Sequence, residues 1–174
     1  GKAAYTLDLP IANSYYISET LAPYGYIRNS NDVYSFNFNY LSETTPKAAF
    51  AHTFENDRTT AKIHIYKVDK ETGVAVPQGD ASLEGAVYGL YARNDIVHPD
   101  GATDVVFKAG DLIATLTTDE YGEAEIDNLY LGNYYVKEIT PSEGYLLDEE
   151  EHDVVCDYEG DLVAEVSRST TSAE

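Results

Sequence analysis

The sequence predicts an all-β fold, specifically an antiparallel β-sandwich built from short strands. Tyr, Val, Ile and Thr, which favour strands, are abundant in the chain. Runs with alternating apolar side chains, such as residues 33–40 (VYSFNFNY), recur between clusters of Gly, Asn and Asp. Apolar residues at helical spacing are not sustained over any stretch long enough for a full helix, so we expect at most a short helical turn.

The second part of the chain is predicted to consist of seven strands separated by turns. The predicted strands cover residues 62–68, 85–92, 112–117, 123–126, 134–139, 151–158 and 162–167. The intervening residues, for example 98–101 (HPDG) and 119–122 (DEYG), tolerate the positive φ angles or side-chain hydrogen bonds of tight turns. About seven strands in roughly 110 residues are typical of an antiparallel sandwich.

Side chains in the strand 62–68 alternate between the two faces of the sheet. Ile63, Ile65 and Lys67 share one face, and the other four side chains share the opposite one. Because the isoleucines mark the apolar face, we expect Lys67 to point into the core.

The sequence contains an internal repeat. Residues 15–26 (YYISETLAPYGY) match residues 134–145 (YYVKEITPSEGY), and upstream of them 1–5 (GKAAY) matches 122–126 (GEAEI). Since the second copy begins near residue 62, the first copy lacks its front half. Residues 1–58 are therefore expected to be the C-terminal part of one sandwich and residues 59–174 a second, nearly complete one.

Half a sandwich does not cover its own apolar face. Residues 1–58 are therefore expected to expose alternate side chains of the run 33–40, with a partner chain or the second domain covering them. The exposed set is expected to be either Tyr34, Phe36 and Phe38 or, on the other face, Val33 and Tyr40.

Charge and cysteine content narrow the possible partners. The formal net charge is -20, from 31 acidic and 11 basic residues, which opposes nucleic-acid binding and contact with anionic membranes. The single cysteine, Cys156, lies in an alternating run and is expected to be a buried thiol without a disulfide partner. No signal peptide, spanning helix or sorting tail is visible, and we expect such segments elsewhere in the gene.

Several motifs of the chain resemble the B-type repeats of the collagen adhesin Cna and the SpaA-type pilin domains of Gram-positive bacteria. The matching segments are KIHIYKVDKETG, LEGAVYGLYA, TTDEYGEAEIDNLYLGNYYVKEITPSEGY and, in the first copy, YYISETLAPYGY with a final FEND. The resemblance implies a prealbumin (transthyretin-like, Greek-key) sandwich and a role as a stalk or pilin body on the cell wall. It also implies that a self-formed isopeptide bond locks each domain, joining a first-strand Lys to a last-strand Asn with help from a buried Glu or Asp.

The chemistry of that bond follows from burial. An apolar core disfavours the charged forms of both amine and carboxyl, so a neutral amine attacks the side-chain amide while a neutral acid carries protons. By position, the resemblance makes Lys67 the nucleophile and Glu138 the acid of the second domain. It makes Glu19 the acid and Asn56 the acceptor of the first.

Neither set of residues is complete in this sequence. The lysine of the first domain is expected upstream of Gly1, which would leave Asn56 unreacted in this chain. The second copy has no Asn after Asn133 and carries Ser or Thr where FEN stands in the first, while Asp157 and Asp161 do not occupy the acceptor's place. Lys67 and Glu138 are therefore expected to form a buried ion pair, a partly exposed edge pair or, with another acceptor, a covalent bond.

Other kinds of site have weaker support. The acidic residues 148–151 (DEEE) and Asp153 lack the ligand spacing and glycine of a calcium loop, and the four histidines form no zinc motif, so neither a metal nor a cofactor is expected. No nucleophile motif of a hydrolase is present, and we expect no enzyme activity beyond a single self-modification.

The leading functional hypothesis is an extracellular, cell-wall-anchored stalk module whose partners are neighbouring repeats of the same protein. The alternative is a module that itself binds a host matrix protein or glycan. A third possibility, an accessory domain of a peptidase, would require a neighbouring catalytic domain, of which this sequence shows no sign.

Overall fold

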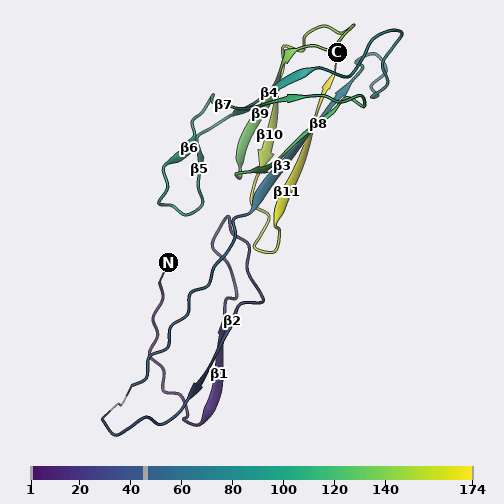
Figure 1. Ribbon diagram of the computed structural model, residues 1–174. Coiled ribbons are helices and arrows are strands. Elements are labelled where there is room, and N and C mark those ends of the chain that lie inside the picture. The colour runs from purple at the N-terminus through teal and green to yellow at the C-terminus, as the bar shows by residue number, and fades with distance from the viewer. Residues whose placement is uncertain (1, 45–46, 174) are drawn as a thin grey trace.

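The computed structural model describes residues 2–44 and 47–173, and all of its regular structure is β (Figure 1). The strands are β1 (Asn13–Ser18), β2 (Val33–Phe38), β3 (Thr60–Val68), β4 (Val87–Ala92), β5 (Ile96–Val97), β6 (Val105–Phe107), β7 (Leu112–Thr117), β8 (Glu123–Leu129), β9 (Gly132–Thr140), β10 (Glu151–Cys156) and β11 (Glu165–Ala173). The predicted all-β class is confirmed.

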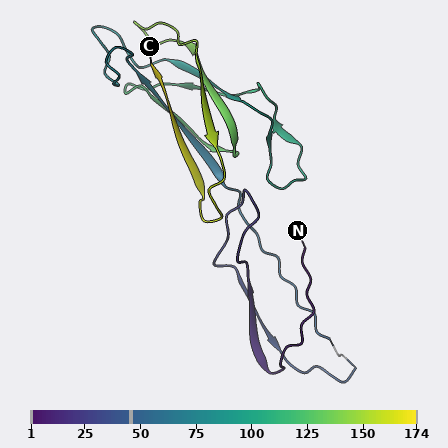
Figure 2. The same cartoon turned by 180° about the vertical axis from the view of Figure 1, so that it is seen from behind.

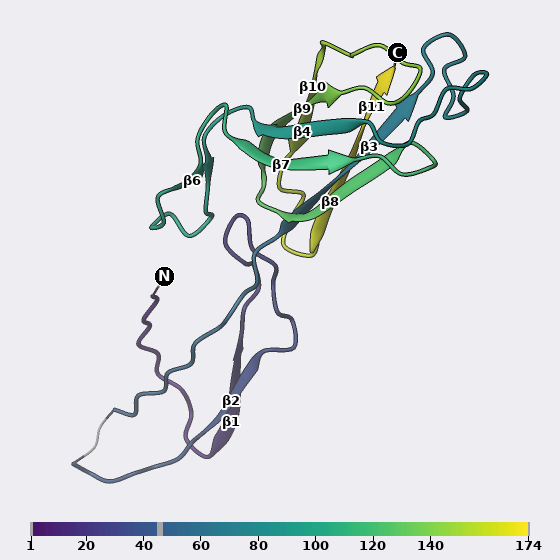
Figure 3. The same ribbon diagram turned by 45° about the horizontal axis from the view of Figure 1, so that its top comes forward.

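Two sheets form a sandwich from residues 59–173, as the tilted view of the ribbon shows (Figure 3). One sheet has the strand order β10-β9-β4-β7 and the other has the order β11-β3-β8. Neighbouring strands are antiparallel, except that β11 runs parallel to β3 in a register that places Ser172 beside Lys67. The first and last strands of the sandwich are therefore direct neighbours.

The core lies between the two sheets. The side chains of β3 alternate between buried and half-buried, so Ile63, Ile65 and Lys67 all point inward, as predicted from the sequence. Tyr88 and Leu90 on β4 face them from the other sheet. Burial of each large apolar side chain stabilises the fold by about 1.5–3 kcal/mol, which makes this face the main source of cohesion.

The observed strands differ most from the predicted ones at two places. The last strand is Glu165–Ala173 instead of residues 162–167, because residues 157–164 form a loop that contacts the N-terminal part of the chain. The hairpin of β5 and β6 was not predicted, since strands of two and three residues are too short to show a periodic pattern. Cys156 ends β10 as a free, buried thiol, and burial raises its pKa to about 11.

The N-terminal segment (residues 2–58, apart from 45 and 46) contains the antiparallel pair β1 and β2. The residues after β2 fold back over one face of this pair, with the Phe50 ring 4.3 Å from Phe36 and the His52 ring 4.9 Å from Tyr34. This face is thus half-covered by the segment itself rather than by the sandwich. Val33 and Tyr40 are exposed, whereas Tyr34, Phe36 and Phe38 are half-buried.

The N-terminal segment extends from one end of the sandwich, and the C-terminus lies at the other end (Figures 1 and 2). Arg58 anchors the connection. Its guanidinium donates hydrogen bonds to the carbonyl oxygens of Leu129 and Asn128, each at 2.8 Å, and to Asn128 Oδ1 at 2.6 Å. It also lies 4.2 Å from the centre of the Tyr130 ring, at a distance typical of cation–π contacts.

A second set of contacts joins the turn at residues 22–28 to the loop 157–164. The backbone N–H of Ala22 donates to Asp161 Oδ2, and the N–H of Arg28 donates to the Asp161 carbonyl oxygen. The hydroxyl of Tyr158 donates to the Tyr26 carbonyl oxygen at 3.0 Å. These bonds fix the angle between the N-terminal segment and the sandwich, and we call this region the joint.

We expect Arg58→Ala to loosen the joint without unfolding the sandwich. The substitution removes three hydrogen bonds from a charged donor and one ring contact, and hydrogen bonds to charged groups are typically worth about 1.5–3 kcal/mol. Amide hydrogen exchange in residues 24–28 should become roughly tenfold faster or more. The matched control is Arg93→Ala, because Arg93 pairs with Glu151 and stacks on a tyrosine away from the joint. Equal exchange in both variants would show that Arg58 does not hold the joint.

Candidate functional site

The centre of the candidate site is an ion pair inside the sandwich. Lys67 points inward from β3 and Glu138 points inward from β9, and their side chains are fully buried. Lys67 Nζ lies 3.2 Å from Glu138 Oε1 and 4.9 Å from the centre of the Tyr145 ring. The structure thus brings the two residues predicted from the sequence within hydrogen-bonding distance. Because both charges are out of water, each depends on the other for compensation.

Asp148 extends the site into a buried polar network. Its backbone N–H donates to Glu138 Oε2 at 2.8 Å, and its Oδ2 accepts a hydrogen bond from Ser172 Oγ at 2.7 Å. A further hydrogen bond of 2.7 Å joins Asp148 Oδ2 to His152 Nε2. Burial raises the pKa of Asp148, but these hydrogen bonds and one from Glu150 outweigh burial, so the pKa lies below its ordinary value. Asp148 is therefore a charged acceptor that holds β9, β10 and β11 together.

Ser172 occupies the place in the last strand that faces the lysine. It lies opposite Lys67 in the register of β11 and β3 and is buried. A hydroxyl at this position supplies no carbonyl carbon for an amine to attack. Asp161, considered as another acceptor, lies at the joint, where it pairs with Arg28. The geometry therefore favours the buried ion pair for Lys67 and Glu138.

The N-terminal segment contains the second predicted pair. Asn56 Nδ2 donates to Glu19 Oε1 at 3.0 Å, although the two residues are 37 positions apart. Asn56 Oδ1 accepts a longer hydrogen bond of 3.4 Å from the Asn29 N–H. Within the described residues, the buried Glu19 Oε2 receives no hydrogen bond. In the internal repeat Glu19 corresponds to Glu138, whose Oε1 meets the lysine amine.

Sequence reasoning missed Asp148, Ser172 and Arg58. Asp148 lies in an acidic run that has the composition of a solvated loop, and Ser172 lies in a stretch of Ser and Thr without a motif. Nothing in the sequence signals the roles of these residues, since the fold determines which distant residues they contact. A stretch of Ser and Thr stands where FEN stands in the first copy, but the sequence alone does not show which of its residues faces Lys67.

The histidines and the acidic residues 148–151 were the other candidate metal ligands in the sequence. Each histidine lies beside one carboxylate, at 2.7 Å for Asp32 with His52 and at 3.3 to 3.4 Å for His64 and His98. In the part of the chain that the structure describes, no three His, Cys, Asp or Glu side chains are grouped as metal ligands would be. No helix in the described ranges has the length and apolar character needed to cross a bilayer.

The comparison with protein families matches this architecture. The model of the SpaA prealbumin-like fold domain matches residues 61–170, which is most of the sandwich. The chain belongs to the SpaA domain family. The predicted resemblance and the prealbumin type of sandwich are thereby confirmed. No curated protein matches the sequence of this SpaA domain chain at a significant level.

One solved structure shares the fold of this SpaA domain chain, and a second is similar to it. The Bacillus anthracis TIE protein is 23% identical and superimposes with a TM-score of 0.59 over 95% of this chain, which corresponds to 26% of the TIE chain. The pilus 2b backbone protein of group B streptococcus is 20% identical, with a TM-score of 0.47, and the match covers 88% of this chain and 53% of that one. The chain therefore spans about a quarter to a half of the length of these relatives.

Proposed function

We propose that this chain is a structural stalk segment of a surface protein or pilus of a Gram-positive bacterium. In this proposal residues 1–58 are the rear part of one SpaA-type domain, and residues 59–174 form a second. The partners are neighbouring domains of the same protein, and the location is the cell wall. Membership of the SpaA family and the fold shared with a pilus backbone protein support this function.

The half-buried pair of Glu19 and Asn56 is the observation that carries the proposal. In support of amide exchange, the Asn56 amide nitrogen lies 3.0 Å from the Glu19 carboxylate, whose second oxygen is buried and unbonded within the described chain. A lysine from an upstream strand would approach this oxygen as Lys67 approaches Glu138. Its amine nitrogen would attack Cγ of Asn56 and form a C–N bond, and ammonia would leave with a proton carried by Glu19.

The second domain is proposed to be held by charge rather than by a covalent bond. Lys67 and Glu138 form a pair with fully buried side chains, and Ser172 stands in the acceptor's place. The two domains would thus use the same three positions differently. The first would be cross-linked once its lysine strand is present, and the second would depend on its ion pair and on the Asp148 network.

Intact mass spectrometry of a chain extended upstream by the missing half-domain tests the proposal. We expect a mass about 17 Da below the calculated value, because one ammonia leaves for each bond formed. Asn56→Ala and Glu19→Gln in the extended chain should abolish the loss, and Asn133→Ala, which changes an amide in the other domain, should not. A folded extended chain with its full calculated mass would contradict the proposed cross-link.

A further inference from the structure

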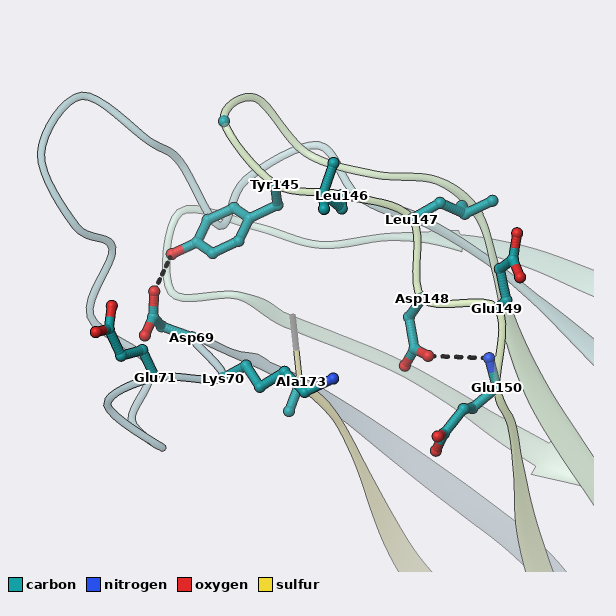
Figure 4. A pocket seen from close by; sticks show the side chains of 11 residues that line it. Asp69, Lys70, Glu71, Tyr145, Leu146, Leu147, Asp148, Glu149, Glu150 and Ala173 are labelled. Carbon is teal, nitrogen blue, oxygen red and sulfur yellow. Dashed lines mark hydrogen bonds between the residues drawn. The ribbon is translucent and has the colours of Figure 1, made fainter.

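The far end of the sandwich, opposite the joint, exposes several apolar side chains. The end is formed by the turns and loops that follow β3, β7 and β9. Its exposed apolar residues are Val74, Val76, Tyr121, Leu146 and Leu147, and Ile139 is exposed near the end of β9. Leu146 is 84% exposed, and it lies with Leu147 on the rim of an open hollow of about 660 Å³ (Figure 4). Soluble surfaces rarely gather apolar side chains without a partner.

The internal repeat relates this end to the joint. The turn at Gly144 has the same structure as the turn at Gly25, with φ angles of 86° and 83°. In both turns a tyrosine N–H donates a hydrogen bond to the carbonyl oxygen three residues earlier. Tyr145 donates to Ser142, and Tyr26 donates to Pro23. The segments 22–28 and 141–147 are therefore the same structural element in two copies.

The two copies differ in what covers them. In the joint, Gly25 is buried against Pro99 of the sandwich, and Ile27 and Arg28 are half-buried. At the far end, Ala81 of the preceding loop packs on Gly144, but Leu146 and Leu147, the counterparts of Ile27 and Arg28, are exposed. The first copy thus shows the element with a following domain in place, and the second shows it uncovered.

We propose that the far end, centred on Leu146 and Leu147, is the docking surface for the leading end of a further SpaA-type domain. The inference rests on the proposed stalk function and names the surface that would continue the array. The occupant would sit as the sandwich itself sits on residues 22–28. Each domain would then present the same turn to the next one, and successive joints would be built alike.

The side chains of this surface define the chemistry of its partner. Arg28 pairs with Asp161 in the joint, whereas its counterpart Leu147 offers an apolar contact. The rim is mainly acidic, since Glu71, Glu149 and Glu150 line the hollow beside a single basic residue, Lys70 (Figure 4). The docking loop of the next domain should therefore be apolar and basic where this domain carries Asp161.

Thiol reactivity in a fused chain tests the inference. A second copy of residues 58–174, carrying Asp161→Lys, is joined after Ala173. Leu146→Cys is introduced in the first copy, and its reaction rate with a thiol reagent is measured in fused and unfused chains. Cys156 does not compete, because it is buried and its pKa is raised to about 11.

We expect the reaction at position 146 to be at least about tenfold slower in the fused chain, as expected for a side chain covered by docking. The matched control, Leu112→Cys on the edge strand β7, starts from 51% exposure and should react at the same rate in both chains. A fused copy that keeps Asp161 should protect position 146 less than the Lys variant.

Two results would overturn the inference. Equal rates at position 146 in fused and unfused chains would show that no following domain docks there. If the reaction at position 146 of the unfused chain became slower as the protein concentration rose, the occupant of the surface would be a second copy of the chain instead. Both readouts are independent of the mass loss expected at Asn56, so this inference and the proposed cross-link fail separately.

Discussion

Ser172→Asn is expected to yield a protein about 17 Da lighter than its calculated mass, because the substitution completes a lysine, acid and amide set in the second domain. Position 172 lies beside Lys67 in the register of β3 and β11, and Glu138 lies 3.2 Å from the amine. The new side-chain amide would therefore meet the amine between the two sheets. The N–C bond would form with release of ammonia, as proposed for Asn56.

The bond should also raise stability strongly. It would close a loop of roughly 100 residues, for which the chain-entropy account of cross-links gives about 4.7 kcal/mol. For a chain of this size, that free energy corresponds to a rise in Tm on the order of 10–20 °C. Intact mass and thermal unfolding by circular dichroism measure the two effects in one sample.

The controls separate bond formation from simple repacking. Ser172→Asn combined with Glu138→Gln keeps the new amide but removes the acid, so the mass should stay at its calculated value and the gain in Tm should vanish. Ser172→Ala removes only the hydroxyl that binds Asp148 and should lower stability slightly. A folded Ser172→Asn protein of unchanged mass would show that register alone does not assemble the reaction.

Lys67→Met is expected to destabilise the sandwich by about 3–5 kcal/mol, the usual cost of leaving one partner of a buried ion pair without compensation. Methionine matches the length of the lysine stem but leaves the buried Glu138 carboxylate without its charge partner. Urea unfolding followed by fluorescence or circular dichroism gives the change in the free energy of unfolding.

The double variant Lys67→Met with Glu138→Gln decides whether the charge is the cause. Glutamine retains an acceptor for the Asp148 N–H but carries no charge, so most of the lost stability should return. The partly exposed pair of Lys62 on β3 and Glu125 on β8, on the outer face of the sheet, provides the comparison. Lys62→Met should change stability by less than about 1 kcal/mol. Equal losses at both positions would rule out a special role for the buried pair.

Much of this fold follows from local pattern. Alternation in β3 predicted that Lys67 points inward, because Lys67 lies on the same face of the strand as two isoleucines. The turn residues predicted β7 at its observed bounds, Leu112–Thr117. The repeat predicted that Glu19 and Glu138 occupy the same place, and the structure sets an amide beside one and an amine beside the other.

The parts that the sequence did not reveal depend on contacts between distant segments. The last strand begins three residues later than predicted because Asp161 is held at the joint by Ala22 and Arg28. The alternation of side chains in the sequence does not reveal contacts with such distant residues. Arg58 lies in a stretch of sequence with the composition of a polar linker, yet its guanidinium donates hydrogen bonds to three oxygens and contacts a tyrosine ring. The role of Ser172 likewise depends on the β3–β11 register, which no local pattern specifies.

The parallel pairing of β3 and β11 has a consequence for a molecule under tension. Force transmitted along the chain enters the sandwich at Thr60 and leaves near Ala173, which are the opposite ends of two adjacent strands. The force therefore acts along the two paired strands, and the hydrogen bonds between them are loaded together in shear instead of breaking one after another. Rupture then requires many bonds to break at once, and a covalent tie between the same two strands would keep the sandwich from extending at all.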